Sequence, residues 1–284
     1  MSEFQLSVYS YKTRQDMKQN FKDQVILITG ASMGIGKELA FVFAKQKAKL
    51  VLAARKLNEL EIVAQEVSNL GGEALIVKTD VTKKEDIHQL LSEIEKKYGK
   101  LDILINNAGK GLYGSWQNTP SESNEDLFDL NFFSLVELTR KTIPLLKKNP
   151  SHFHKTQIIN IASIASFWPV PKMGPYCASK AALHVFSNIL RIELKKEGIH
   201  VLCVYPGIIN TGFSENAPNP RQEHVPEDYK TKGKGLSPQK LAQKILKAAA
   251  THKKREYVTF SNRLLIKSYQ HLPSFFEWIM QRFA

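Results

Sequence analysis

Seven short apolar runs recur along this chain, and a helical pattern separates each run from the next. The first run, residues 25–28, stops at Gly30, and a helical pattern follows over residues 34–45. Runs that are apolar on both faces and alternate with helices are typical of a parallel sheet covered on both sides. Right-handed crossovers between such strands give a doubly wound α/β fold. The other predicted strands are residues 50–52, 74–77, 103–105, 158–161, 201–204 and 257–258.

This pattern predicts a single large domain with a segment at each end. Residues 1–22 are polar with isolated aromatic side chains, and we interpret them as a lead-in that covers a sheet edge or lies loose. Residues 23–260 form the predicted catalytic domain, a usual length for one large α/β sheet. Within it, residues 207–236 lack any periodic pattern and contain several Pro and Gly, which predicts a lid over a substrate site. Residues 261–284 are a predicted helical tail.

A glycine-rich turn directly follows the first predicted strand, with the sequence Thr29-Gly30-Ala31-Ser32-Met33-Gly34-Ile35-Gly36. Glycines let a backbone turn sharply and approach a pyrophosphate, and the start of the next helix offers free amide groups to that anion. The spacing differs from the common G-x-G-x-x-G, but the order of strand, turn and helix predicts a Rossmann dinucleotide site. Its predicted contacts are Gly30, Ser32, Met33, Gly34, Ile35 and Gly36.

The same turn also spells G-x-S-x-G, the nucleophile elbow of α/β-hydrolases. In that interpretation Ser32 is a nucleophile and the protein is an esterase. Three features disfavour it. The elbow would follow the first strong strand, Gly36 would have no role, and no acid and histidine stand at the ends of later strands.

The end of the second predicted strand indicates which dinucleotide binds. A carboxylate at this place holds a free ribose hydroxyl, whereas a cation accommodates a 2′-phosphate. Here the sequence is Ala53-Ala54-Arg55-Lys56, and the next acid is Glu59, so NADP is favoured over NAD. The prediction depends on Arg55 because Met33 in the glycine turn is not basic. The alternative is that Arg55 merely begins a helix that faces solvent.

Tyr176 and Lys180 lie four residues apart in a long helical run that ends near Glu197. Residues at this spacing share one helix face, so a phenol and an ammonium would stand side by side. An adjacent cation favours the phenolate, which would make the tyrosine a proton donor and acceptor near neutral pH. Taken alone, the pair is also compatible with one packed ring and one solvated charge.

With these motifs in order, residues 23–258 resemble the short-chain dehydrogenase/reductase family. The resemblance implies that Ser163 hydrogen-bonds the substrate carbonyl, Tyr176 delivers the proton, Lys180 lowers the pKa of the phenol and binds the nicotinamide ribose, and Asn131 holds a water. Any one motif could arise by chance, but the whole set at the ends of successive strands is specific. The motifs are TGASMGIG at 29–36, Asp80-Val81, Asn106-Asn107-Ala108-Gly109, Asn131, Ser163, Tyr176, Lys180, Pro206-Gly207 and Thr211.

The resemblance also implies the cofactor contacts outside the glycine turn. Asp80 and Val81 flank the adenine, and Asn107 and Gly109, with Ala108 between them, line its ribose side. At the nicotinamide end, Ile209 and Thr211 follow Pro206 and Gly207. Hydride arrival at a carbonyl carbon places negative charge on oxygen, so the site needs a neutral donor and a proton source aimed at one point. Ser163 and Tyr176 supply these two groups.

Aromatic residues around the catalytic set indicate a hydrophobic substrate, such as a lipid, steroid or acyl ketone. A smaller or polar carbonyl compound is the alternative, because half of these side chains could pack in the core or against a second subunit. A protein that kept the fold only to bind a dinucleotide or dock on membranes is the second functional class. The predicted lining residues are Trp116, Phe167, Trp168, Met173 and Phe213, with Leu112 and Tyr113 beside them.

The formal charge of +13 is concentrated near the C-terminus, where residues 230–284 hold 12 Lys and Arg but only Glu256 and Glu277 as acids. Uneven charge argues for a local surface partner and not for nucleic acid. Because basic residues mix with Trp, Phe and Leu after residue 260, the tail is predicted to lie on a membrane. An arm that packs on a neighbouring subunit fits equally well.

The cysteine content and the resemblance set the remaining expectations. Cys177 and Cys203 are the only cysteines, which predicts no disulfide framework, no metal site and a reducing compartment. We therefore expect a cytoplasmic protein, peripheral on a membrane if the tail binds lipid. A homodimer or homotetramer is what the family resemblance implies.

Overall fold

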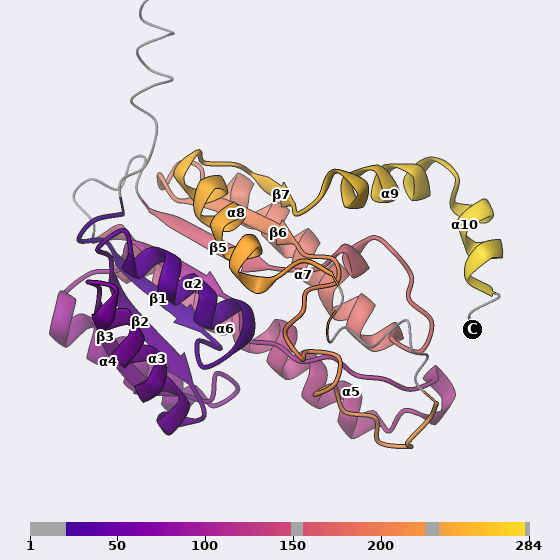
Figure 1. The fold of residues 1–284 in the computed structure, drawn as a ribbon, viewed down its shortest axis with the longest axis horizontal. Coiled ribbons are helices and arrows are strands. Elements are labelled where there is room, and N and C mark those ends of the chain that lie inside the picture. Colours follow the sequence, from indigo (N-terminus) through magenta and orange to yellow (C-terminus); the bar gives the residue numbers. More distant parts are fainter. Residues whose placement is uncertain (1–20, 149–155, 225–232, 234, 282–284) are drawn as a thin grey trace, which may run out of the picture.

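The computed structural model describes residues 21–148, 156–224, 233 and 235–281, and its centre is one parallel sheet (Figure 1). The seven strands are ordered β3-β2-β1-β4-β5-β6-β7, and every neighbouring pair is parallel. The predicted doubly wound Rossmann fold is confirmed. The strands are β1 (Val25–Thr29), β2 (Lys49–Ala54), β3 (Glu73–Lys78), β4 (Ile103–Asn106), β5 (Gln157–Ile161), β6 (His200–Tyr205) and β7 (Arg255–Tyr257).

Helices cover both faces of this sheet because the central strands are apolar on both sides. One face packs against α2 (Gly34–Ala44), α3 (Leu57–Asn69) and α8 (Pro238–Ala250). The opposite face packs against α4 (Lys84–Tyr98), α6 (Ser134–Lys147) and α7 (Gly174–Glu193). Every residue of β1, β4 and β5 is buried, which explains why these strands appear in the sequence as unbroken apolar runs.

The strand order reverses between β1 and β4, and this reversal positions the site. The chain passes from β1 outward to β2 and β3, then returns to β4 on the other side of β1. Ile28 of β1 is paired with Ile105 of β4, so the two strands end at the same edge of the sheet. In open α/β sheets, ligands bind in the crevice outside such a pair of strand ends.

The two ends of the sheet differ from the sequence prediction. The last strand, β7, is Arg255–Tyr257 and not residues 257–258, and it leaves Arg255 exposed at the edge of the sheet. Phe21, predicted as part of the lead-in, is only 2% exposed and packs edge-on against Phe43 of α2, with ring centroids 5.0 Å apart. The packed domain therefore begins before residue 23. The rest of the predicted lead-in, residues 1–20, lies outside the described residues.

Two helices follow β7 and extend away from the sheet: α9 (Phe260–His271) and α10 (Pro273–Met280) (Figure 1). Only Ile266 of α9 is buried, and α10 has no buried residue although most of its side chains are apolar. Pro273 begins the second helix and separates the two. In the described parts of the chain, no helix combines the length and the apolar character needed to cross a bilayer.

Candidate active site

Tyr176 and Lys180 stand one turn apart near the start of α7. The helix begins at Gly174, and Pro175 lies in its first turn. Backbone N–H groups in a first turn have no partner within the helix, so proline, which lacks one, is tolerated there. Both side chains face inward, with exposed fractions of 8% for Tyr176 and 5% for Lys180. The alternative of a solvated lysine is therefore wrong, because Lys180 is buried. Its ammonium lies 5.9 Å from the centre of the Tyr176 ring.

Ser163 reaches the same point from the end of β5. It caps the short helix η3 (Ile164–Ser166), and its Oγ accepts a hydrogen bond from the Ala165 amide at 3.1 Å. The Ser163 hydroxyl also lies close enough to the Tyr176 phenol to act on the pKa of that phenol. The strand end and the helix therefore bring two neutral O–H groups to one buried position, as expected for a site that receives a carbonyl oxygen.

Burial dominates the ionisation of this site. It raises the pKa of Tyr176 to about 12, and the Ser163 side chain acts in the opposite direction. Burial also lowers the pKa of Lys180 to about 8. The Lys180 ammonium donates a hydrogen bond to the Ile161 carbonyl at 3.1 Å. That Lys180, together with a bound nicotinamide, lowers the pKa of the phenol stays a prediction. The phenol stays protonated at neutral pH.

Asn131 joins the loop after β4 to the catalytic helix. It lies in a π-helical turn, η2 (Asp129–Phe133), between α5 (Ser121–Phe128) and α6, and its side chain is fully buried. Its amide group accepts from the Lys110 N–H at 2.9 Å and donates to the Lys110 carbonyl at 3.0 Å and to Ser179 Oγ at 3.2 Å. The side chain is thus used in holding Lys110 next to α7. Its predicted role in binding a water stays a prediction.

The glycine turn has the geometry of a phosphate-binding turn. Gly30 and Gly34 have φ angles of 62° and 56°, a backbone conformation that favours glycine. Gly36 has a different constraint, because a Cβ built there would stand 2.2 Å from the Gly30 carbonyl oxygen. The helix α2 begins directly after Met33, and no side chain caps it. The backbone N–H groups of its first turn are therefore free to bind an anion. These features fit a dinucleotide pyrophosphate at this helix start.

Asn107 holds the turn itself through its side chain and its backbone. Its side-chain amide donates to the carbonyl oxygens of Thr29 and Gly30, at 2.9 and 3.1 Å. In return, the Thr29 hydroxyl accepts from the backbone amides of Asn107 and Ala108, at 3.0 and 3.1 Å. The Asn107 side chain therefore joins the ends of β1 and β4, and its predicted place on the ribose side of the cofactor stays a prediction. Thr29 begins the glycine-rich motif, but the sequence did not predict this role for its hydroxyl.

The predicted adenine side of the cofactor site collects Arg55, Asp80 and Val81. Arg55 is exposed directly after β2, and Val81 is 7% exposed. The Asp80 carboxylate accepts from the Thr82 amide and hydroxyl at 3.1 and 2.8 Å. Burial acts to raise the pKa of Asp80, but these bonds, with the charges of Arg55 and Lys83, hold it below its usual value. The Arg55 charge is therefore close enough to act on the Asp80 carboxylate.

The predicted nicotinamide end joins the catalytic pair to the glycine turn. Gly109 lies beside Asn131 and Lys180, since a Cβ built on it would be 3.1 Å from Asn131 Oδ1 and 3.5 Å from Lys180 Nζ. Thr211 approaches Gly34 of the turn, with a corresponding distance of 3.4 Å. Pro206 and Ile209 are buried, and Gly207 lies against Asn262 of α9.

The predicted substrate-lining residues divide into two groups. Met173 packs in one cluster with Tyr176, and the Phe213 ring lies 5.8 Å from the Tyr176 ring, so both border the catalytic phenol. Trp116 is 76% exposed and lies outside that cluster. Leu112 and Tyr113, which the sequence also indicated, are buried in it.

Phe167 and Trp168 contact other parts of the chain, and their predicted place in the substrate lining stays a prediction. Phe167 packs behind the site, with its ring centroid 4.5 Å from that of His184 and 5.0 Å from that of Tyr205. Trp168 contacts the C-terminal helices, at 5.4 Å from the Tyr269 ring and 5.1 Å from the Phe276 ring. Two neighbouring aromatic side chains point in different directions, and the sequence pattern could not tell which of them faces the substrate.

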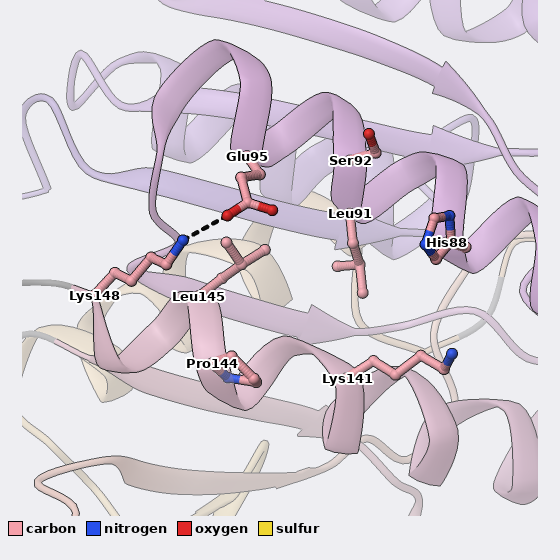
Figure 2. A pocket seen from close by; sticks show the side chains of 8 residues that line it. All are labelled: His88, Leu91, Ser92, Glu95, Lys141, Pro144, Leu145 and Lys148. Atoms are coloured by element: carbon pink, nitrogen blue, oxygen red, sulfur yellow. Dashed lines mark hydrogen bonds and ion pairs between the residues drawn. The ribbon is translucent and has the colours of Figure 1, made fainter.

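A separate hollow of about 250 Å³ lies between α4 and α6 (Figure 2). Lys148 and Glu95 form an ion pair across one end of it. None of the predicted site residues is among the eight that line it, so we do not connect it with the catalytic set. The lining residues are His88, Leu91, Ser92, Glu95, Lys141, Pro144, Leu145 and Lys148.

Comparisons with known proteins agree with this geometry. A family model described as short chain dehydrogenase matches residues 24–222. A "Dehydrogenase/reductase SDR family protein 7-like" from Drosophila melanogaster is 30% identical over 98% of this chain and 86% of its own length. An "11-beta-hydroxysteroid dehydrogenase-like 3" from Arabidopsis thaliana is 39% identical over 69% of this chain, and the match spans 62% of that relative.

One solved structure illustrates the similarity in three dimensions. It is a 3-ketoacyl-(acyl-carrier-protein) reductase from Brucella melitensis complexed with NADH, which is 28% identical. The similarity covers 84% of this chain and 96% of that one, with a TM-score of 0.74. The chain belongs to the short-chain dehydrogenase/reductase family of oxidoreductases.

Proposed function

We propose that this protein transfers a hydride between NADP(H) and the carbonyl or hydroxyl group of a hydrophobic substrate. The observation that carries the proposal is the burial of Ser163 and Tyr176 beside each other, with Lys180 one turn further along the same helix. NADPH oxidation over a panel of carbonyl compounds tests it. Failure to oxidise either NADPH or NADH with any of them would contradict the proposal.

The protein's own groups account for the proton in this reaction. When bound, the nicotinamide supplies the hydride that reduces the carbonyl carbon. Ser163 donates a hydrogen bond to the carbonyl oxygen, and Tyr176 gives that oxygen its proton. Because burial keeps the pKa of Tyr176 at about 12, the phenol is available in its donor form at neutral pH. The Lys180 ammonium, 5.9 Å from the ring centre, then stabilises the phenolate that remains.

The choice of NADP over NAD rests on Arg55. Its guanidinium follows β2 at the place where a carboxylate would hold a free ribose hydroxyl, and Lys56 beside it is paired with Glu59 at 2.7 Å. Arg55 is therefore the better candidate of the two cations for a 2′-phosphate, since a guanidinium can bind two phosphate oxygens at once.

Arg55→Asp is expected to reverse the cofactor preference. The carboxylate would repel a 2′-phosphate and accept hydrogen bonds from a free ribose hydroxyl, so KM for NADPH should rise about 100-fold while KM for NADH falls. Steady-state kinetics with both cofactors measures this, and Lys56→Asp is the matched control, expected to have a smaller effect. An unchanged NADPH preference in Arg55→Asp would contradict the assignment.

A hydrophobic substrate is supported by the side chains around Tyr176. The catalytic ring is buried in one cluster with Leu112, Tyr113 and Met173. Phe213, which follows β6, faces the same ring. Apolar walls with a few polar groups are typical of sites for hydrophobic ligands. The carbonyl compounds to test first are therefore long-chain ketones, acyl compounds and steroids.

We also propose that α9 and α10 lie on an anionic membrane surface. Large apolar side chains on the two helices are open to solvent, including Phe260 at 80%, Leu264 at 55% and Trp278 at 52%. Arg263 and Lys267 are exposed among them. Aromatic and aliphatic side chains mixed with cations favour the interface of an anionic bilayer. We propose a cytoplasmic, reducing setting, which is supported by the free thiols of Cys177 and Cys203.

Phe275→Ser combined with Trp278→Ser is expected to weaken binding to vesicles that contain phosphatidylserine by about tenfold or more, because two half-exposed aromatic anchors are lost. Co-sedimentation measures the effect. Ile62→Ser on α3, where the side chain is 63% exposed, is the matched control and should bind as the unmodified chain does. If the unmodified chain does not co-sediment, the membrane proposal is wrong, and a change in oligomer size with the double variant would favour a subunit contact instead.

A homo-oligomer is supported by a different surface, on α7. Val185, Ile189 and Ile192 follow one another at helical spacing and are 54%, 46% and 76% exposed. Phe133, at the start of the neighbouring α6, is 56% exposed. Such an apolar stripe on the outside of a domain is typical of a contact between identical subunits.

A further inference from the structure

A seam of contacts joins two segments that are far apart in the sequence, residues 111–119 after β4 and residues 213–223 after β6. The Tyr113 amide donates to the Pro218 carbonyl at 2.9 Å. Further out, Arg221 Nε donates to the Asn118 carbonyl at 3.4 Å. Backbone and side-chain bonds therefore fix the second segment along the length of the first.

Glu223 makes the densest set of bonds in this seam. Its carboxylate accepts from the Ser115 amide at 3.1 Å, from the Ser115 hydroxyl at 2.6 Å and from the Asn118 side-chain amide at 3.2 Å. Asn219 holds the glutamate in place through two bonds, from its side-chain amide to the Glu223 carbonyl and from the Glu223 amide to its side-chain oxygen. The bonds from Ser115 hold the pKa of Glu223 below its usual value, so the carboxylate is charged at neutral pH.

The inner end of the seam lies at the catalytic phenol. A Cβ built on Gly111 would stand 2.9 Å from the Ala217 methyl and 3.3 Å from the Phe213 ring, so the two segments touch closely there. Phe213 in turn faces Tyr176, with ring centroids 5.8 Å apart. The position of Phe213 therefore depends on how the segment that carries it is held against residues 111–119.

We propose that Glu223 is a positioning residue for the active site, which bonds Ser115 and Asn118 and so keeps Phe213 in front of Tyr176 on the substrate side. The assignment rests on the proposed oxidoreductase function only for its kinetic consequence. With the bonds of Glu223 lost, the outer part of the segment keeps the Asn118–Arg221 and Tyr113–Pro218 hydrogen bonds but loses its charged contact with residues 111–119. The wall that Phe213 provides for a hydrophobic substrate then becomes loose, while the Ser163, Tyr176 and Lys180 set is untouched.

Hydrogen exchange of the full chain tests the structural part without any substrate. Glu223→Ala is expected to speed exchange in the peptide 111–119 by about fivefold or more, because the Ser115 amide loses its acceptor and the Tyr113 amide is held less tightly. Glu223→Gln keeps an acceptor oxygen, so the exchange rate of this peptide should lie between those of the unmodified chain and of Glu223→Ala. Glu61→Ala, which removes an exposed carboxylate from α3, is the matched control and should leave the peptide unchanged.

Kinetics with decanal and NADPH test the consequence. In Glu223→Ala, KM for decanal should rise about tenfold while kcat changes less than about threefold. The variant loses the hydrogen bonds of the Glu223 carboxylate, but it keeps the Tyr176 phenol as proton donor. Adding Ser115→Ala to Glu223→Ala should then have little further effect, because both changes remove the same bonds.

The outcomes separate the two proposals. Faster exchange at 111–119 with no turnover by the unmodified chain would support the role of Glu223 in the seam and contradict the proposed reaction. Turnover with unchanged exchange and unchanged KM in Glu223→Ala would overturn the role of Glu223. Faster exchange throughout the chain would also overturn it, because the glutamate would then stabilise the whole fold and not this seam.

Discussion

Tyr176→Phe is expected to reduce kcat for carbonyl reduction by about 10³-fold or more, since it removes the proton donor and leaves the ring. The ring packs with Met173 and Tyr113 and faces Phe213, and phenylalanine keeps these contacts. Thermal stability and NADPH affinity should therefore change little. The measurements are kcat from NADPH oxidation, the melting temperature, and NADPH binding followed by its fluorescence.

The matched control for this substitution is Tyr98→Phe. Tyr98 ends α4 and its hydroxyl donates to Glu73 at 2.9 Å, far from the catalytic residues in the sequence and in the fold. The same chemical change there should leave kcat within about twofold. If Tyr176→Phe also retained kcat within about tenfold, the phenol would not be the proton donor. Loss of folding in Tyr176→Phe would instead show that the hydroxyl has a structural role through Ser163.

Local patterns predicted the strands and the parts of the site that stand directly at strand ends. Residues 25–28 and 103–105 are apolar on both faces, and the turn at Gly30 and the motif at Asn107 follow them within a few residues. In a parallel sheet the ends of such strands meet at one edge, so nearness in space follows from the alternation alone. Tyr176 and Lys180 were predictable in the same way, because helical spacing fixes their common face.

What could not be predicted depends on long-range packing. Glu223 and Ser115 are 108 residues apart, and nothing in either local sequence indicates that they meet. Phe167 and Trp168 are equally hydrophobic neighbours, and only the presence of His184 and Tyr205 behind the first decides which ring turns inward. The start of β7 at Arg255 could not be predicted for the same reason. This edge strand has one neighbour, and its first residue is set by pairing with Cys203.

The ionisation of the site depends on burial, which the sequence does not show. The sequence placed a cation beside Tyr176 but contained no information on how deeply the pair is buried. Burial disfavours the charged form of both groups, so it raises the pKa of Tyr176 and lowers the pKa of Lys180. Lys180 also spends its hydrogen bond on the Ile161 carbonyl. A spacing of four residues therefore predicts neighbours but not their pKa values.

Gly36→Ala is expected to destabilise the fold by ~3 kcal/mol and to weaken NADPH binding by about 100-fold, because overpacking at rigid backbone forces the chain to move. The added methyl group would stand 2.2 Å from the Gly30 carbonyl oxygen, 2.6 Å from Asn107 Nδ2 and 2.9 Å from the Gly30 carbonyl carbon. Two of these atoms are main-chain atoms of the turn, and the third is the amide that bonds Thr29 and Gly30. Relief of the contact must therefore separate α2 from the turn that is proposed to bind the phosphates.

Gly174→Ala provides the control, because a Cβ there has no neighbour within 4 Å and α7 accepts alanine at its first residue. That change should leave the melting temperature the same or slightly higher, since alanine favours the helix. For Gly36→Ala the melting temperature should fall by about 5–10 °C. If both variants melt like the unmodified chain and bind NADPH equally well, the close approach of α2 to the turn has no role in holding the cofactor, and the glycine spacing of this chain needs another explanation.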